Sequence, residues 1–135
     1  MSLETVTIST SKYVTTVNAK IDDHVYTVRK MGAGSQLDLS REINNLARMR
    51  TDLLNLQAQV EKAESDEEAE KLMQKNFDKM ADFDKVVKRI EDIFIELFDD
   101  HEDGKKSKKL VHALGIDNIQ HVYNEIFDKA EKDAE

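Results

Sequence analysis

Residues 66–98, DEEAEKLMQKNFDKMADFDKVVKRIEDIFIELF, decide the fold of this chain. Large apolar side chains recur there at spacings of three and four, which places them on one face of a helix: Met73, Met80, Phe83, Val87, Ile90, Phe94 and Leu97, widened near the end by Ile93 and Phe98. Only Asn76 interrupts this stripe. The chain contains no proline, so nothing forbids a long, unbroken helix.

A similar stripe precedes this stretch and predicts a second long amphipathic helix, with Ser35 or Asp38 as its N-cap. Its apolar positions are Leu39, Leu46, Leu53 and Val60, seven residues apart, completed by Met49, Leu56 and Ala63. The two predicted helices have similar lengths, so they can lie side by side. Burial of their apolar faces against each other would then be the main source of stability.

The boundary between the two helices is less certain from the residues alone. Ser65 followed by Glu68 is a capping-box sequence, which favours the start of a new helix at this point. Residues 59–71, however, contain neither glycine nor proline and consist largely of good helix formers. A continuous or kinked helix is therefore the alternative.

The segment before these helices is the one region with β-forming composition. Residues 13–21 alternate in character, residues 25–29 are rich in β-branched side chains, and Asp22-Asp23 lies between them, which predicts a β-hairpin. An isolated hairpin is marginally stable, so we expect a third strand, at Thr5 to Thr10, or a helix packed on it. Met1-Ser2-Leu3 is left out of this prediction, and Gly32-Ala33-Gly34 marks a break before the helices.

The C-terminal part predicts short helices. Residues 110–114 form an apolar run that Gly115 stops, and Asp117 then caps a last helix whose apolar face holds Ile119, Val122, Tyr123, Ile126 and Phe127. The predicted fold class is mainly α with a small N-terminal β-hairpin (α+β): a long antiparallel helical pair plus short C-terminal helices. Residues 1–34 form the β element and residues 35–135 the helical region, together one domain.

Composition excludes several function classes. A formal charge of −8 opposes binding to nucleic acid or to anionic lipid, and no apolar run is long enough to span a membrane. The absence of cysteine excludes disulfides and thiolate chemistry and is compatible with a reducing cytoplasm.

The polar residues give no support for catalysis. His24, His101, His112 and His121 include no pair at the spacing of four that puts two ligands on one helix face. The acidic run at residues 99–104 does not follow the ligand order of an EF-hand loop, and solvated acidic loops are common at helix ends. We therefore expect no enzymatic activity, no metal and no cofactor.

The apolar side chains instead point to protein binding. Core packing is the default role of the Met and Phe stripe, but a long, thin helical pair cannot bury every apolar position, so some of this surface is expected to meet a partner. Self-association and binding of another protein's helix both remain open. The candidate partner-binding residues are Met73, Met80, Phe94, Phe98, Tyr123, Ile126 and Phe127.

Taken as a whole, the chain resembles the small tail assembly chaperones of long-tailed phages (siphophages) that infect Gram-positive bacteria. The resemblance rests on layout: residues 20–31 resemble the N-terminal β element of such proteins, residues 34–40 open the helical part, and residues 114–127 resemble their short C-terminal helices. None of these residues is a catalytic marker.

The resemblance implies a non-enzymatic protein of the host bacterial cytoplasm. Such a protein would bind and solubilise the long helical tape measure protein until the tail tube assembles around it. The strong central helical pair departs from the family pattern. It favours, as the alternative, a structural tail component or a phage-encoded helical regulatory or inhibitor protein that acts as an oligomer.

Overall fold

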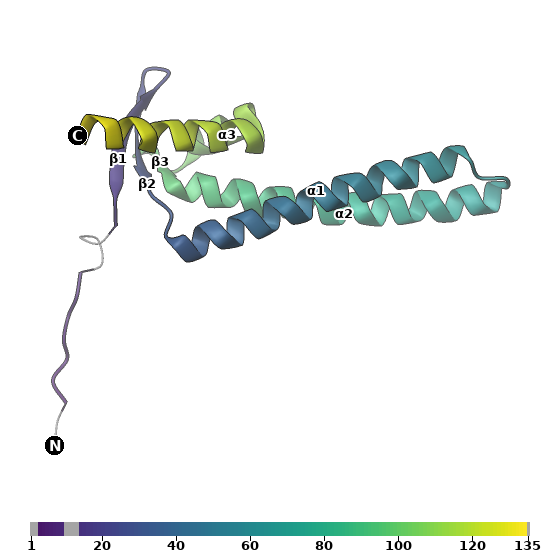
Figure 1. Cartoon of the computed structure of the whole chain (residues 1–135), viewed down its shortest axis with the longest axis horizontal. Coiled ribbons are helices and arrows are strands. Elements are labelled where there is room, and N and C mark those ends of the chain that lie inside the picture. The colour runs from purple at the N-terminus through teal and green to yellow at the C-terminus, as the bar shows by residue number, and fades with distance from the viewer. Residues whose placement is uncertain (1–2, 10–13, 135) are drawn as a thin grey trace.

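The structure, a computed structural model, describes residues 3–9 and 14–134, with side chains as far as residue 132. It is mainly helical with a small antiparallel sheet in the order β1-β2-β3, which confirms the predicted fold class. The sheet, helix α3 and the adjoining ends of α1 and α2 form a compact body. The rest of the α1–α2 hairpin projects from this body as a rod (Figure 1).

The N-terminal hairpin forms where the sequence predicts it. Strand β1 (Thr16–Ile21) pairs with β2 (His24–Arg29), with Ile21 opposite His24. The two turn residues, Asp22 and Asp23, have φ angles of 47° and 72°. Positive φ at both positions gives the turn a twist that matches the twist of the flanking strands, and Asp tolerates this conformation better than most residues.

The predicted place of the third strand is wrong, whereas the alternative, a helix packed on the hairpin, is confirmed by the contacts between β1 and the C-terminal helix, Lys105–Ala134. Strand β3 (Phe98–Asp99) pairs with β2, with Val28 opposite Phe98 and Thr27 opposite Asp99. Residues 5–9 are in no strand, and Thr10 lies outside the described residues. Phe98, expected at the end of a helix, is in extended backbone with its side chain fully buried. Its burial is the physical reason for the difference, because a strand lets Phe98 join the core beside Tyr26, at a ring distance of 6.4 Å.

The two long helices are separate and antiparallel. Helix α1 (Ala33–Glu61) and helix α2 (Asp66–Leu97) are about 44 and 48 Å long at 1.5 Å per residue. Ser65 caps α2, because its Oγ accepts a hydrogen bond of 3.2 Å from the Glu68 N–H, so the predicted start of a second helix at this point is confirmed. The predicted caps of α1 are wrong: its N-cap is Gly32, without a side-chain hydrogen bond, and the helix begins inside the expected break.

The seam between these helices follows the predicted stripes near the body and departs from them toward the tip. Leu39, Leu46 and Leu56 are buried on α1, and Ile90, Phe94 and Leu97 on α2. Val86 is buried where Val87 was predicted, and Val87 and Phe83 are half-buried. In the described part of the chain, none of the helices combines the length and the apolar character that crossing a bilayer requires.

Helix α3 (Lys105–Ala134) bends sharply at Gly115, whose φ of 78° and ψ of 170° are not helical. The predicted stop at Gly115 is therefore confirmed. Beyond the bend, Ile119, Tyr123 and Phe127 are buried, and Val122 and Ile126 are half-buried. Helix α3 lies across the sheet and beside the end of α2, so it shields the core from solvent on this side (Figure 1).

Candidate functional site

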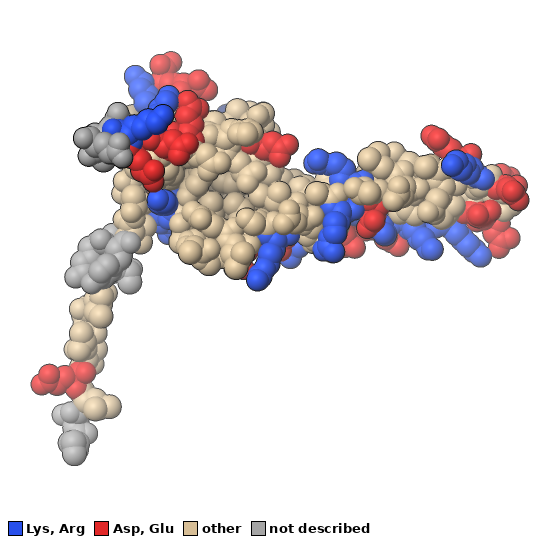
Figure 2. Space-filling view, in the orientation of Figure 1, with Lys and Arg blue, Asp and Glu red and all other residues tan. Residues whose placement is uncertain are grey.

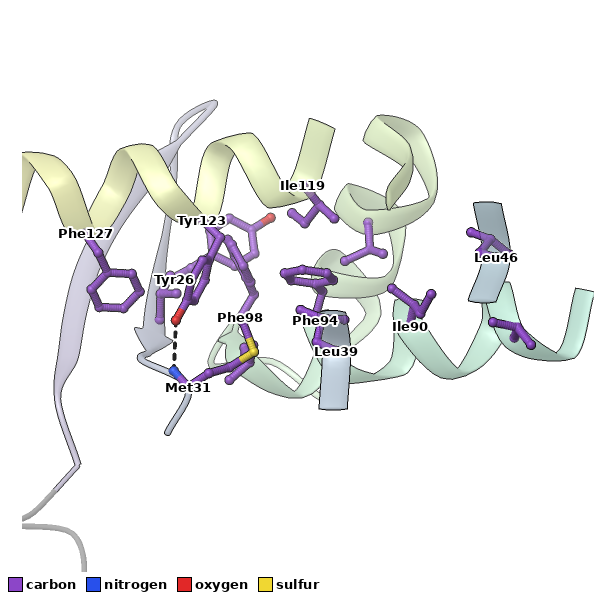
Figure 3. Packing of buried hydrophobic residues seen from close by; sticks show 14 residues of the cluster. Tyr26, Met31, Leu39, Leu46, Ile90, Phe94, Phe98, Ile119, Tyr123 and Phe127 are labelled. Atoms are coloured by element: carbon purple, nitrogen blue, oxygen red, sulfur yellow. Dashed lines mark hydrogen bonds between the residues drawn. The ribbon is translucent and has the colours of Figure 1, made fainter. Parts of the chain in front are cut away.

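Four of the seven candidate partner-binding residues lie in the core. Phe94 and Phe98 are fully buried, and Tyr123 and Phe127 are 6% and 7% exposed. The Phe94 and Tyr123 rings meet edge to face at 6.2 Å, and the Tyr123 and Phe127 rings are 4.9 Å apart (Figure 3). Their assignment to a partner surface is wrong, because α3 folds back over α2 and the sheet and seals these side chains.

Tyr123 also has a polar role inside the core. Its hydroxyl accepts a hydrogen bond of 2.8 Å from the backbone N–H of Met31, at the point where the chain passes from β2 to α1 (Figure 3). A buried N–H without a partner would be costly, so this bond fixes α3 to the entry of the helical hairpin.

The other three candidates reach the surface. Met73 and Met80 are 47% and 45% exposed on the outer half of α2. Ile126 is half-buried and lies far from them, in a groove between β1 and α3. The seven predicted residues therefore do not form one surface. Of the three that reach the surface, only Met73 and Met80 lie together.

Two residues that the sequence prediction missed belong with these methionines. Phe77, on α2, and Leu54, on α1, are each 61% exposed. Met73, Phe77 and Met80 are spaced by four and three residues, so they share one side of α2. The sequence contained a signal for Phe77, because it lies four residues from Met73 and three from Met80 at the edge of the predicted stripe. An apolar residue at the edge of a stripe widens the apolar side of a helix beyond what one neighbouring helix covers.

An ion pair between the two helices places Leu54 at the same level as this series. The Lys79 Nζ lies 3.6 Å from the Asp52 Oδ2, so these residues are at the same level. Two residues further toward the tip, Leu54 and Phe77 are therefore at the same level as well. Two residues correspond to about 200° of helix rotation, so both side chains point away from the side that carries the ion pair. Leu54, Met73, Phe77 and Met80 thus form one surface, called here the hairpin face.

The hairpin face continues the side of α2 that α3 covers nearer the body. Glu91 follows Met80 by eleven residues, close to three full turns, so it lies on the same side of α2. Its Oε2 is 3.4 Å from the Nε2 of His112 on α3. The outer half of the hairpin extends past α3 (Figure 1).

Charged side chains lie around the apolar part of the outer hairpin. Figure 2 shows Lys, Arg, Asp and Glu gathered along one edge and at the tip, with an uncharged stretch between them. Arg50 and Gln57, one turn on either side of Leu54, are exposed polar neighbours. An apolar centre with a polar rim is the usual composition of a protein-binding surface.

The acidic loop has a structural role. The carboxylate of Asp100 is 1% exposed and accepts four backbone hydrogen bonds, from the N–H groups of Glu102, Gly104, Lys106 and Ser107, at 2.8 to 3.1 Å. It thereby caps the start of α3. Burial alone would raise the pKa of Asp100, but the four donors outweigh it and lower the pKa from 3.8 to about 2.

The same loop is joined to the sheet. The His24 Nε2 donates a hydrogen bond of 2.7 Å to the Asp100 carbonyl, and the Ser107 hydroxyl donates to the Phe98 carbonyl. Burial, together with the charge of Asp100, raises the pKa of the Tyr26 hydroxyl above 10.0. Among the residues that the structure describes, no group of three or more His, Asp or Glu side chains is arranged to hold a metal ion.

Comparison of the chain with protein-family models, with curated proteins and with solved structures finds no match in any of the three.

Proposed function

We propose that this chain is a non-enzymatic tail assembly chaperone that binds and solubilises the tape measure protein in the host cytoplasm. The observation that carries the proposal is the hairpin face: four large apolar side chains, 45% to 61% exposed, on a rod that projects from the body. Exposed apolar side chains grouped on one surface are typical of a binding site.

The shape of the hairpin face favours a helical partner. Met73, Phe77 and Met80 follow one another along the axis of α2, and Leu54 is at the level of Phe77 on α1, so the apolar side chains run along the hairpin as a stripe. A stripe of this kind fits the apolar side of an amphipathic helix laid along it. Methionine side chains are flexible and adapt to different apolar partners. This suits a chaperone that must hold successive segments of a long protein.

The net charge of −8 supports the same role. Copies of an acidic protein bound along one chain repel the copies on other chains, which keeps the bound protein from aggregating. Contacts that are weak singly also become strong when they are repeated along one long partner.

The direct test is co-expression with the tape measure protein encoded in the same phage genome. We expect the wild-type chain to raise the soluble fraction of that protein and to co-purify with it. The double variant Met73→Asp/Phe77→Asp should lose both effects, because it puts charges in the apolar stripe. No gain in solubility and no co-purification with the wild-type chain would reject the chaperone function.

Gln59→Asp is the matched control. Gln59 is exposed and follows Asp52 by seven residues, so it lies on the ion-pair side of the hairpin. This variant should solubilise the tape measure protein as the wild type does. Circular dichroism should show all variants folded, since the substituted side chains are exposed. If the wild type binds and the double variant binds equally well, the chaperone function stands but the hairpin face is not its site.

The alternative is a structural tail component, and the open edge of the sheet, Thr16–Ile21, favours it as a possible contact between subunits. Mass spectrometry of purified virions separates the two functions. A chaperone should be absent from the mature tail, whereas a structural component should be present in a fixed ratio to the tube protein.

A further inference from the structure

We infer that residues 4–9 of one copy of this chain bind as an added strand to the free edge of β1 in a second copy. The inference is independent of the hairpin face and concerns the other end of the molecule.

The free edge of β1 is the receiving surface. Strand β1 is the first strand of the sheet, and among the described residues it pairs only with β2. The Lys30 N–H donates a hydrogen bond of 2.8 Å to the Thr15 carbonyl. This bond determines which residues of β1 point their backbone groups toward β2 and which point them away. Thr16, Asn18 and Lys20 therefore direct their backbone N–H and C=O groups away from β2, toward the edge. Such a row of backbone groups is a template for another strand.

A groove beside this edge offers apolar side chains to the added strand. It has a volume of about 500 Å³ and lies between β1 and the last part of α3. Ala130 lines it, together with five further apolar residues: Val17, Ala19, Ile21, Val122 and Ile126. All five are half-buried and belong to the margin of the core cluster. A strand placed on β1 could cover them with side chains from one of its faces.

Residues 4–9, ETVTIS, have the composition of such a strand. β-Branched residues occupy 5–8, and apolar Val6 and Ile8 alternate with Thr5 and Thr7. In extended backbone, Val6 and Ile8 share one face. They are 79% and 64% exposed, because this segment runs away from the body of its own chain (Figure 1).

The occupant is a second copy because the chain cannot readily turn this segment onto its own β1. Thr15 already continues the line of β1 through its bond to Lys30, so a hairpin would have to reverse before it. The intervening sequence, STSKYV at 9–14, contains no Gly, Asn, Asp or Pro, and its Ser and Thr residues favour tight turns more weakly than these do. Pairing between two copies needs no turn.

The test compares two matched double variants by sedimentation velocity over a range of concentrations. We expect the wild type to associate, and Val6→Ser/Ile8→Ser to weaken association at least about tenfold, because it removes the side chains that enter the groove. Thr5→Ser/Thr7→Ser changes the opposite face of the same segment and should weaken association much less. A wild type that stays monomeric at all concentrations would overturn the inference, as would equal effects of the two variants.

A complementary variant blocks the edge. Lys20→Pro removes an N–H that points away from β2, a change that edge strands tolerate, and circular dichroism should show it folded. Alone, Lys20→Pro and Val6→Ser/Ile8→Ser should each associate poorly. Mixed, the intact segment of the first variant can bind the intact edge of the second. Native mass spectrometry of the mixture, with one variant ¹⁵N-labelled, should show a mixed dimer; its absence would overturn pairing between copies.

Discussion

At the residue scale, the strongest local device is the Asp100 carboxylate, which holds the start of α3 through four backbone N–H groups. An aspartate of this kind was visible in the sequence only as part of an acidic run. The run suggested solvated charge, whereas one of its members is buried and serves as a cap. Sequence composition does not distinguish these roles, because the difference lies in which carboxylate turns inward.

Asp100 should make stability depend on acid. Its pKa is about 2 in the folded chain and near 3.8 when unfolded, so the carboxylate stabilises the fold fully above 3.8, and this contribution is lost as the pH falls toward 2. Asp100→Asn should lower stability at neutral pH and flatten this acid dependence. Urea unfolding from neutral pH down to about 2 measures both effects. An unchanged acid slope in the variant would contradict the assignment.

Tyr123 should act on stability through its hydroxyl. Tyr123→Phe keeps the ring but leaves the Met31 N–H without its acceptor, so we expect a loss of about 1–3 kcal/mol in the free energy of unfolding. Chemical denaturation with an unchanged m-value is the measurement. The sequence placed Tyr123 on a partner surface, where the same change would leave stability unaltered and weaken binding.

At the scale of elements, periodicity predicted both long helices but not how far they pack. The heptad-like stripes place Leu46 and Ile90 in the seam correctly. Met73 and Met80 belong to the same series yet remain half exposed, because α3 and the sheet cover only the end of the hairpin nearer the body. Burial along a helix depends on neighbours that a periodic pattern does not contain.

The hairpin should therefore respond to mutation according to position. Ile90→Ala should cost about 2–5 kcal/mol, and Ile90→Asp, like Phe83→Asp, should unfold the chain, since each puts a charge in the seam. Phe77→Ala should change stability by no more than about 0.5 kcal/mol, because the side chain is 61% exposed. Thermal and urea unfolding check these values. A large loss at Phe77 would show that the hairpin face is part of the core.

The bend of α3 gives a further test at this scale. Gly115 has a φ of 78° and a ψ of 170°, so Gly115→Ala should cost about 1–3 kcal/mol through backbone strain alone, as the added Cβ meets no atom within 4 Å among the described residues beyond its chain neighbours. Gly34→Ala is the matched control. It lies in the first turn of α1 with equal free space and should stabilise by up to about 1 kcal/mol. Equal effects at the two glycines, measured by urea unfolding, would contradict this account.

At the scale of the whole molecule, the sequence predicted the class and order of elements, but not the strand that completes the sheet. Local composition pointed to residues 5–10, which are β-like, and placed Phe98 at the end of a helix. The structure reverses this because Phe98 gains more from burial beside Tyr26 than from another helical turn. The hairpin face was half predicted: Met73 and Met80 were named, while Phe77 and Leu54 lay outside the periodic stripes.

The pairing of β2 with β3 also has a consequence for synthesis. Val28 and Phe98 are neighbours in the sheet although 70 positions separate them along the chain (98 − 28). The β1–β2 hairpin leaves the ribosome first and must wait, with Val28 uncovered, while the α1–α2 rod is translated. The rod forms from local contacts and so folds quickly. Because its two helices are antiparallel, it brings the end of α2 back beside the sheet. Closure of the sheet therefore waits until α2 is complete, and the core is finished only when α3, translated after β3, brings Ile119, Tyr123 and Phe127 onto it.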